Sequence, residues 1–345
     1  MTSVTKRAIH RSVRRSTSAT TSNARRRPRV LTNASYEAVR SQISHIRSTR
    51  RRLTATGHGT TIVRLMFAWL LASIPSPSHG GFSIGPLKFR AYGLCIALGV
   101  VIAARVAGRR WAARGGKADD LTAVLTWAVP AGVVGARAYH VATDWKSFRG
   151  RWFDVVKIWQ GGLGVWGGIG LGVVVGLLVA KQRGMPLGPL LDTVAPALPL
   201  GQAIARWGNW FNIELFGGPT SLPWGLEVPL AKRPERFASS STFHPTFLYE
   251  SLWNLLVVGL ILLLERRARR AEKRLPNGTL FASYVALYTF GRFWIERIRI
   301  DSASKLFGLR INEWTSMILF TVSLVVLVVR RRSTTNTHTV ANPAQ

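Results

Sequence analysis

Long apolar stretches constrain this chain more than any other feature. They recur from residue 92 to residue 329, and their few charged residues sit mainly at their ends. A membrane-spanning helix needs roughly 20 mostly apolar residues. Seven stretches approach that length: 92–108, 121–143, 162–180, 187–205, 246–264, 279–296 and 312–329. The sequence therefore predicts an all-α polytopic membrane protein with about seven transmembrane helices.

The distribution of basic residues predicts the orientation of these helices. Lysine and arginine collect after the first, third, fifth and seventh stretches, at 109–114, 181–183, 266–274 and 330–332. Cytoplasmic loops carry an excess of these residues, so these ends are expected to be cytoplasmic. The opposite loops also contain basic residues, which makes the bias moderate. The long connection between the fourth and fifth helices is then a periplasmic or extracytoplasmic loop region.

The first 60 residues conflict with this topology. They hold 14 Lys or Arg against one acid, Glu37, with many Ser and Thr, a composition typical of disorder. Three interpretations stay open: a basic arm kept inside by an extra span near 62–74, a targeting segment, or an upstream extension before a start at Met66. We expect three parts: 1–65 as a disordered extension, 66–332 as the seven-helix transmembrane catalytic domain, and 333–345 as a polar tail. No nucleic-acid partner is expected.

Several common kinds of site are not predicted. A lone Cys95 excludes a disulfide framework within the chain, and no paired-histidine metal motif occurs, so neither a metal nor a cofactor is expected. The run Gly162–Gly167 matches G-x-G-x-x-G, but a long apolar stretch follows it rather than a βαβ unit. Glycines 164, 168, 172 and 176 recur every four residues on one helical face. That spacing favours close helix packing in a membrane.

Polar and charged residues interrupt the apolar stretches in four places. Charged side chains at membrane depth are costly and usually functional. The segment 206–217 contains Arg206, Asn209 and Glu214, and its glycines predict irregular backbone. The other places are His244 to Glu250, the helical stripe Tyr288, Arg292, Glu296 and Arg299, and Tyr92. The stripe alone fits a structural ion-pair ladder equally well.

The two arginines Arg206 and Arg292 indicate an anionic ligand. No matching free acids are evident for them, and guanidinium groups bind phosphate through two hydrogen bonds. In a membrane, the expected phosphate is a phospholipid headgroup. The sequence therefore predicts a lipid-processing site that faces outward.

The order of these motifs resembles the bacterial prolipoprotein diacylglyceryl transferases. Residues Ala205 to Gly217 are similar to the signature G-R-x-G-N-F-x-N-x-E-x-x-G of that family. Further similar segments follow the same order along the chain: 90–93, Gly135-Ala136-Arg137, 158–163, His244-Pro245, Leu248-Tyr249-Glu250 and 288–296. The resemblance extends from about Ile74 to Arg330.

The resemblance implies a reaction, its partners and a location. The family transfers the diacylglyceryl group of phosphatidylglycerol to the thiol of the lipobox cysteine in a prolipoprotein, and glycerol phosphate leaves. The implied partners are phosphatidylglycerol, prolipoprotein signal peptides with a lipobox Cys, and the lipid bilayer. The implied location is the bacterial inner (cytoplasmic) membrane, with the active site toward the outer leaflet.

The resemblance also implies roles for nine residues. The phosphate and the leaving-group charge would be held by Arg206 and Arg292, while Asn209 and Glu214 orient the headgroup. The implied catalytic set is Arg206, Arg292, Tyr92, Tyr288 and His244, and the implied phosphatidylglycerol-binding set is Arg206, Asn209, Glu214, Gly217, Arg292 and Glu296.

This sequence departs from the family pattern at three positions. Trp166 stands where many members have His, Phe247 stands where Gln is common, and Ala205 replaces a Gly. The general base is therefore open between His140 and His244. A multi-span transporter of an anionic substrate, or a purely structural membrane protein, would also explain the spans and the buried charges. A transporter would normally show internal repeats, and no convincing repeat relates the two halves.

Overall fold

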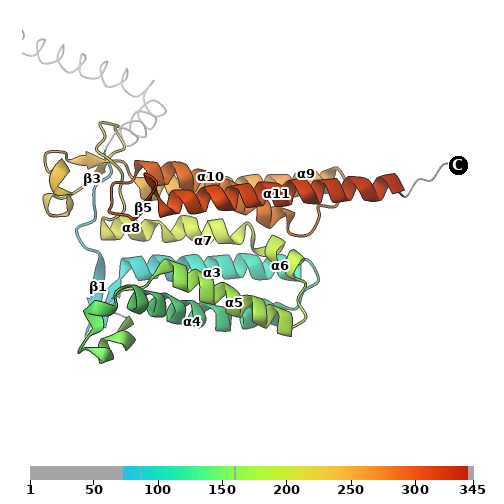
Figure 1. The fold of residues 1–345 in the computed structure, drawn as a ribbon, viewed down its shortest axis with the longest axis horizontal. Helices are drawn as coiled ribbons and strands as arrows, with labels where there is room; N and C mark the ends of the chain where they lie inside the picture. The colour runs from blue at the N-terminus through green and yellow to red at the C-terminus, as the bar shows by residue number, and fades with distance from the viewer. Residues whose placement is uncertain (1–72, 86, 159–160, 341–345) are drawn as a thin grey trace, which may run out of the picture. The chain divides into compact units, whose positions relative to one another are not determined.

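Helices account for most of the structure, a computed structural model that describes residues 73–85, 87–158 and 161–340 (Figure 1). The nine α-helices of this part of the chain are α3 (Ala91–Ala112), α4 (Ala118–Thr143), α5 (Val165–Gln182), α6 (Leu187–Val194), α7 (Ala197–Ala205), α8 (Trp207–Asn212), α9 (Thr246–Arg270), α10 (Thr279–Ile298) and α11 (Ile311–Val340). The predicted extension 1–65 and Met66 lie outside the described residues. Helix α11 continues to Val340, into the segment predicted as a tail.

Five helices are long and apolar enough to cross a membrane. Within the described residues they are Ala91–Ala112, Asp119–Thr143, Val165–Gln182, Thr246–Arg270 and Ile311–Arg332. The prediction of an all-α polytopic membrane protein is confirmed. The predicted count of about seven is not confirmed, because α10 is not apolar enough along its length and the range 187–205 holds two short helices.

The single span predicted at 187–205 is wrong. Two short helices, α6 and α7, occupy this range and meet at Pro196. Proline has no backbone N–H to donate and its ring clashes with the preceding helical turn, which explains the interruption. The consequence is that α7 can run beside α3 and α9 independently of α6.

The long helices lie side by side, and the short strands gather at one end of them (Figure 1). Three antiparallel pairs make up these strands: β1 (Gly81–Ile84) with β2 (Leu87–Arg90), β3 (Leu226–Glu227) with β4 (Thr242–Phe243), and β5 (Lys305–Leu306) with β6 (Leu309–Arg310). We call this the strand end. Helix α6 and the end of α11 lie at the other end, which we call the basic end. There Glu265 of α9 pairs with Arg110 of α3 and with Arg114 just after that helix, each at 2.9 Å.

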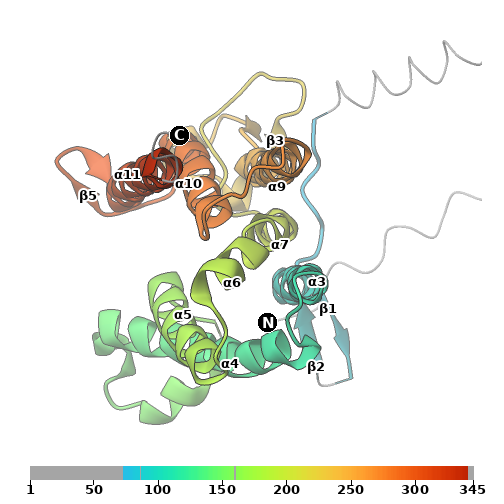
Figure 2. The same cartoon turned by 90° about the vertical axis from the view of Figure 1, so that its right-hand side faces the viewer.

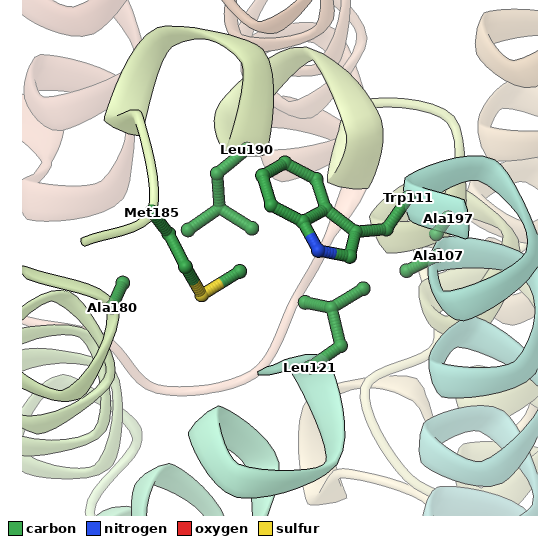
Figure 3. Close-up of a cluster of buried hydrophobic side chains, with 7 residues drawn as sticks. All are labelled: Ala107, Trp111, Leu121, Ala180, Met185, Leu190 and Ala197. Carbon is green, nitrogen blue, oxygen red and sulfur yellow. The ribbon is translucent and has the colours of Figure 1, made fainter. Parts of the chain in front are cut away.

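A buried apolar cluster anchors the basic end (Figure 3). Trp111 of α3, Leu121 of α4 and Met185 before α6 pack with Leu190 of α6. The Trp111 indole Nε1 donates a hydrogen bond to Asp120 at 3.2 Å. This cluster ties α3, α4 and α6 together far from the strand end.

Glycines bring α4 and α5 into close contact. A Cβ placed on Gly167 would lie 2.2 Å from the carbonyl oxygen of Gly135, and one on Gly168 would lie 3.2 Å from that of Gly132. Gly172 approaches the same helix, at 3.2 Å from the Ala128 oxygen. The predicted packing role of the α5 glycines is confirmed.

A second glycine contact places α7 beside α3. A Cβ on Gly99 would lie 2.6 Å from the carbonyl oxygen of Gly201. Viewed along the helices, α7 lies between α3 and α9 (Figure 2). Arg206, at the end of α7, is thereby carried to the strand end between these two helices.

Candidate functional site

Arg206 lies at the junction of α7 and α8, where the backbone leaves regular helix. Helix α8 has six residues and ends at Asn212. The next residues include two left-handed conformations without glycine, Ile213 at φ 52° and Leu215 at φ 58°. A positive φ is costly for a β-branched residue such as Ile213, and such strain is typical of functional sites. The predicted irregular backbone is confirmed, although its strained positions are not the glycines.

The Glu250 carboxylate, in the first turns of α9, joins the two predicted arginines. Arg206 Nε lies 2.7 Å from Glu250 Oε2, and Arg292 Nη1 lies 2.9 Å from Glu250 Oε1. Arg292 also pairs with Glu296. The expectation that these arginines lack matching acids is therefore wrong. Glu250 was noticed in sequence only as part of a motif, and the structure makes it the centre of the site.

Glu296 is the most enclosed of the predicted site residues, with no exposed surface. Its carboxylate contacts Arg292, Arg299 and Arg310, and accepts a hydrogen bond from Asn312 at 3.2 Å. This is the ion-pair ladder considered as the alternative for the α10 stripe. The ladder fixes Arg292 on the side away from Glu250.

Asp301 extends the ladder beyond the end of α10. It pairs with Arg299 at 2.8 Å and with Arg310 at 2.9 Å. Burial alone would raise the pKa of Asp301, but the hydrogen bonds and charges of these two arginines outweigh it and hold the pKa below its usual value. Arg310 and Asp301 were not predicted, because their loop shows no helical spacing.

The cluster keeps a surplus of positive charge. Four guanidinium groups, on Arg206, Arg292, Arg299 and Arg310, face the three carboxylates of Glu250, Glu296 and Asp301. Arg206 is the most accessible of the four, with 23% of its side chain exposed against 13% for Arg292 and 7% for the other two. Arg206 is thus the guanidinium of this cluster that is most open to a ligand.

A second polar group surrounds Glu214. Its Oε1 accepts hydrogen bonds from the side-chain amides of Asn209, at 3.0 Å, and Asn212, at 3.2 Å. Tyr92 of α3 packs on Gly208, where a Cβ would lie 2.8 Å from the tyrosine ring. The structure therefore brings Tyr92, Asn209 and Glu214 together on the strand-end side of Arg206.

His244 and Gly217 form the rim of the site next to α9. His244 Nδ1 lies 3.1 Å from the Tyr249 hydroxyl, which accepts a hydrogen bond from the Trp224 indole at 3.2 Å. Partial burial lowers the pKa of His244, so its neutral form is favoured. The Gly217 amide donates to the His244 carbonyl at 2.9 Å, and a Cβ on Gly217 would lie 2.6 Å from Ile298. Gly217 thus serves through its lack of a side chain.

Tyr288 lies one helical turn from Arg292 on α10, and its ring packs against that of Tyr284 at 5.9 Å. It belongs to the buried cluster between α9 and α10. Of the predicted site residues it lies furthest toward the middle of the helices.

Arg137 of α4 is a buried cation away from this cluster. It donates hydrogen bonds to the carbonyls of Val155 at 2.7 Å, Gly161 at 2.8 Å and Gly162 at 2.9 Å, and to that of Asp154. Its guanidinium also lies 5.2 Å from the centre of the Phe148 ring. Arg137 therefore holds the loop that precedes α5, a contact that its spacing along the chain does not predict.

The three departures from the family pattern have different surroundings. Trp166, in the first turn of α5, is 46% exposed. Phe247 is buried and packs edge-on against Trp207, with ring centres 5.4 Å apart. Ala205 is simply the last residue of α7. Trp166 and Phe247 thus present apolar surface where the family pattern has a polar group.

An apolar groove of about 400 Å³ lies next to the strand-end half of α3. Leu94, Cys95 and Leu98 form one wall, and Phe82 of β1 and Phe211 of α8 add further apolar lining. Cys95 is half-buried there. Among the described residues, no group of three or more His, Cys, Asp or Glu side chains is placed to hold a metal ion.

Together these features define a polytopic membrane protein with a cluster of arginines and carboxylates at one end of its helices. Comparison with known proteins gives the family. The sequence model of the prolipoprotein diacylglyceryl transferases matches residues 80–329, and the chain belongs to that family.

Proteins named phosphatidylglycerol–prolipoprotein diacylglyceryl transferase are similar over most of their length. One of two relatives from Streptomyces coelicolor, transferase 2, is 49% identical over 264 residues, which cover 75% of this chain and 81% of the relative. The one from Streptomyces griseus is 47% identical over 262 residues, covering 75% and 78%. The one from Cutibacterium acnes is 45% identical over 281 residues, covering 81% and 91%. These matches give no support to the transporter alternative.

Proposed function

We propose that this protein transfers the diacylglyceryl group of phosphatidylglycerol to the thiol of a prolipoprotein lipobox cysteine. A carbon–sulfur thioether bond forms, the carbon–oxygen bond to phosphate breaks, and glycerol phosphate leaves. The reaction takes place at the strand end, at the outer leaflet of the bacterial cytoplasmic membrane. The observation that carries this proposal is the pair of arginines on one carboxylate, Arg206 and Arg292 on Glu250.

In this proposal the arginines bind the lipid phosphate and stabilise the charge that develops on it. Preorganised donors in a site with little water stabilise such charge strongly. Arg206 is partly exposed and paired only with Glu250 among the described residues, so the phosphate can take a place on its guanidinium. Glu296 keeps Arg292 aimed at Glu250 rather than touching the lipid itself.

The remaining predicted residues surround this phosphate position. Asn209 and Glu214 orient the headgroup, with Tyr92 behind them, while Gly217 lets the backbone pass close to His244. The attacking sulfur comes from the peptide, and a thiol with a pKa near 8.5 is mostly protonated at neutral pH. A base must therefore take this proton. His244 and His140 both remain candidates for that step.

The experiment is direct transfer by the purified full-length protein. The protein is incubated with phosphatidylglycerol vesicles and a lipobox peptide, and the products are weighed by mass spectrometry. We expect a peptide heavier by one diacylglyceryl group and an equal amount of glycerol phosphate. A peptide with Ser in place of the lipobox Cys is the control and should stay unmodified. Absence of both products, while a related transferase is active in the same assay, would refute the proposal.

A further inference from the structure

Three buried side-chain oxygens lack a hydrogen-bond partner among the described residues: Gln202 Oε1, Glu250 Oε2 and Asn254 Oδ1. Glu250 Oε2 lies close to Arg206, but the N–H does not point along a hydrogen bond. Asn254 is 1% exposed and Glu250 is 4% exposed. Buried polar atoms are nearly always hydrogen-bonded. Glu250 Oε2 still has the charge of Arg206 beside it, but Gln202 Oε1 and Asn254 Oδ1 have no partner, and these two acceptors in one region call for a physical reason.

Helical spacing places these acceptors next to one another. Gln202 lies four residues before Arg206 on α7, and Asn254 lies four residues after Glu250 on α9. The two helices are antiparallel, so both residues lie one turn further toward the basic end than the Arg206–Glu250 pair. The Ser251 hydroxyl donates to the Ala203 carbonyl at 3.0 Å, which fixes this register. We call Gln202, Glu250 and Asn254 the acceptor layer.

Helix α10 supplies the third side of the layer. Tyr288 and Tyr284 lie four and eight residues before Arg292, on the same helical face, and their rings pack at 5.9 Å. The Gln202 side chain forms a hydrogen bond with the Tyr284 hydroxyl, while its Oε1 atom has no partner. The side-chain amide of Asn254 is already used, because it donates to the Glu250 carbonyl at 2.8 Å. What Asn254 still offers is its oxygen, which only accepts.

Acceptors require a ligand that donates hydrogen bonds. A cationic donor such as an ammonium group is disfavoured, because the guanidinium groups of Arg206 and Arg292 already lie on Glu250 at the edge of the layer. A neutral hydroxyl group fits both the acceptors and the charge. A lipid whose phosphate lies on Arg206 and Arg292 would bring its headgroup within one helical turn of the layer.

We propose that the acceptor layer is a subsite for the hydroxyl groups of the lipid headgroup. The inference rests on the proposed function, since it takes the phosphate of the same lipid to lie on the two arginines. The hydroxyls of a polyol headgroup donate to Gln202 Oε1 and Asn254 Oδ1, and the headgroup turns into the protein. The layer thereby selects polyol phospholipids over phospholipids whose headgroup carries no hydroxyl.

The test compares two lipids with the same acyl chains: phosphatidylglycerol, and phosphatidylpropanol, whose headgroup has no free hydroxyl. Binding of each to the full-length protein is measured without peptide, and transfer is measured with peptide. We expect the wild type to prefer phosphatidylglycerol by about tenfold or more, the size of one or two good hydrogen bonds. Asn254→Leu and Gln202→Met each remove one acceptor. Each should reduce this preference by weakening the binding of phosphatidylglycerol while leaving the binding of phosphatidylpropanol unchanged.

Thr289→Val is the matched control. Thr289 is also buried on α10, but its hydroxyl already donates a hydrogen bond to the Val285 carbonyl at 2.7 Å. The preference of Thr289→Val for phosphatidylglycerol should therefore equal that of the wild type. Gln202→Met guards against a folding defect in Asn254→Leu, because Gln202 is less buried. If both variants bound the two lipids more weakly by the same factor, or if the preference for phosphatidylglycerol were unchanged, the proposed subsite would be refuted.

Failure of the subsite and failure of the transferase proposal give different results. Transfer from both lipids at the same rate would support the transferase proposal and refute the subsite. A binding preference for phosphatidylglycerol that depends on Asn254, without any transfer to the peptide, would support the subsite and refute the transferase proposal.

Discussion

The α4–α5 pair and the α7–α9–α10 group are held together in opposite ways. Between α4 and α5, glycine backbones touch, and Gly167 approaches the Gly135 carbonyl too closely to allow a side chain. Between α7, α9 and α10, guanidinium and carboxylate groups meet, with Glu250 bridging Arg206 and Arg292.

The difference separates scaffold from site. Small residues give close contact without any charge inside the membrane, which is the simplest way to associate helices there. Buried ion pairs, in contrast, are often no better for stability than apolar packing. Their presence in one group of helices and not in the other indicates that the charges serve a ligand. The predictions below test this division from the largest expected effect to the smallest.

Loss of Glu296 should give the largest effect. Glu296→Ala leaves Arg292, Arg299 and Arg310 without their common carboxylate, and breaking a buried ion pair costs about 3–5 kcal/mol. Denaturant unfolding in detergent should show that loss. The exposed Glu235→Ala is the control and should unfold like the wild type. If Glu296→Ala were equally stable, the ladder would not be structural.

Loss of Arg206 should remove activity and spare the fold. Removing one charge-stabilising donor typically lowers the rate by about 100-fold to 1,000-fold, and we expect Arg206→Ala and Arg292→Ala to lose at least that much transfer. Arg206→Ala should still insert at normal abundance, because its side chain is partly exposed. Exposed Lys232→Ala controls for a general loss of positive charge. Transfer near the wild-type rate in both arginine variants would refute the phosphate assignment.

Substitution of the packing glycines should lower stability and spare the chemistry. Gly→Ala in a helix normally stabilises by roughly 1 kcal/mol, but in Gly167→Ala the new Cβ would lie 2.2 Å from the Gly135 oxygen. We expect this variant to lose about 1–3 kcal/mol, and Gly172→Leu to be harmed more in folding than in chemistry. Gly170→Ala on the same helix meets nothing within 4 Å and should be neutral or stabilising. Equal melting temperatures for the two alanine variants would contradict the packing account.

The smallest effect concerns His244. Burial lowers the pKa of His244 from 6.5 in the folded protein. Below pH 6.5 the unfolded chain takes up a proton that the folded chain resists, so stability falls as pH falls. His244→Gln cannot titrate, and its melting temperature should therefore decrease less than that of the wild type between pH 7 and pH 5. If the melting temperatures of the two proteins decreased equally between pH 7 and pH 5, His244 would have the same pKa in the folded and unfolded chain, which would contradict this prediction.

The sequence predicted local features well and distant pairings poorly. Helical spacing sufficed for the α5 glycines and for the α10 stripe, because both patterns lie within one helix. It could not show that Glu250 meets Arg206 and Arg292, since these residues are 44 and 42 positions apart and come together only through packing of three helices. Arg310 and Asp301 were missed for the same reason. The break at Pro196 was missed because the flanking residues are apolar on both sides.

The most direct test of the division between scaffold and site measures two quantities on two variants. Transfer per folded molecule and melting temperature are determined side by side for Arg206→Ala and Gly167→Ala. The account predicts that Arg206→Ala melts near the wild type and is inactive, while Gly167→Ala melts lower and keeps its activity per folded molecule. An active Arg206→Ala, or a stable but inactive Gly167→Ala, would contradict it.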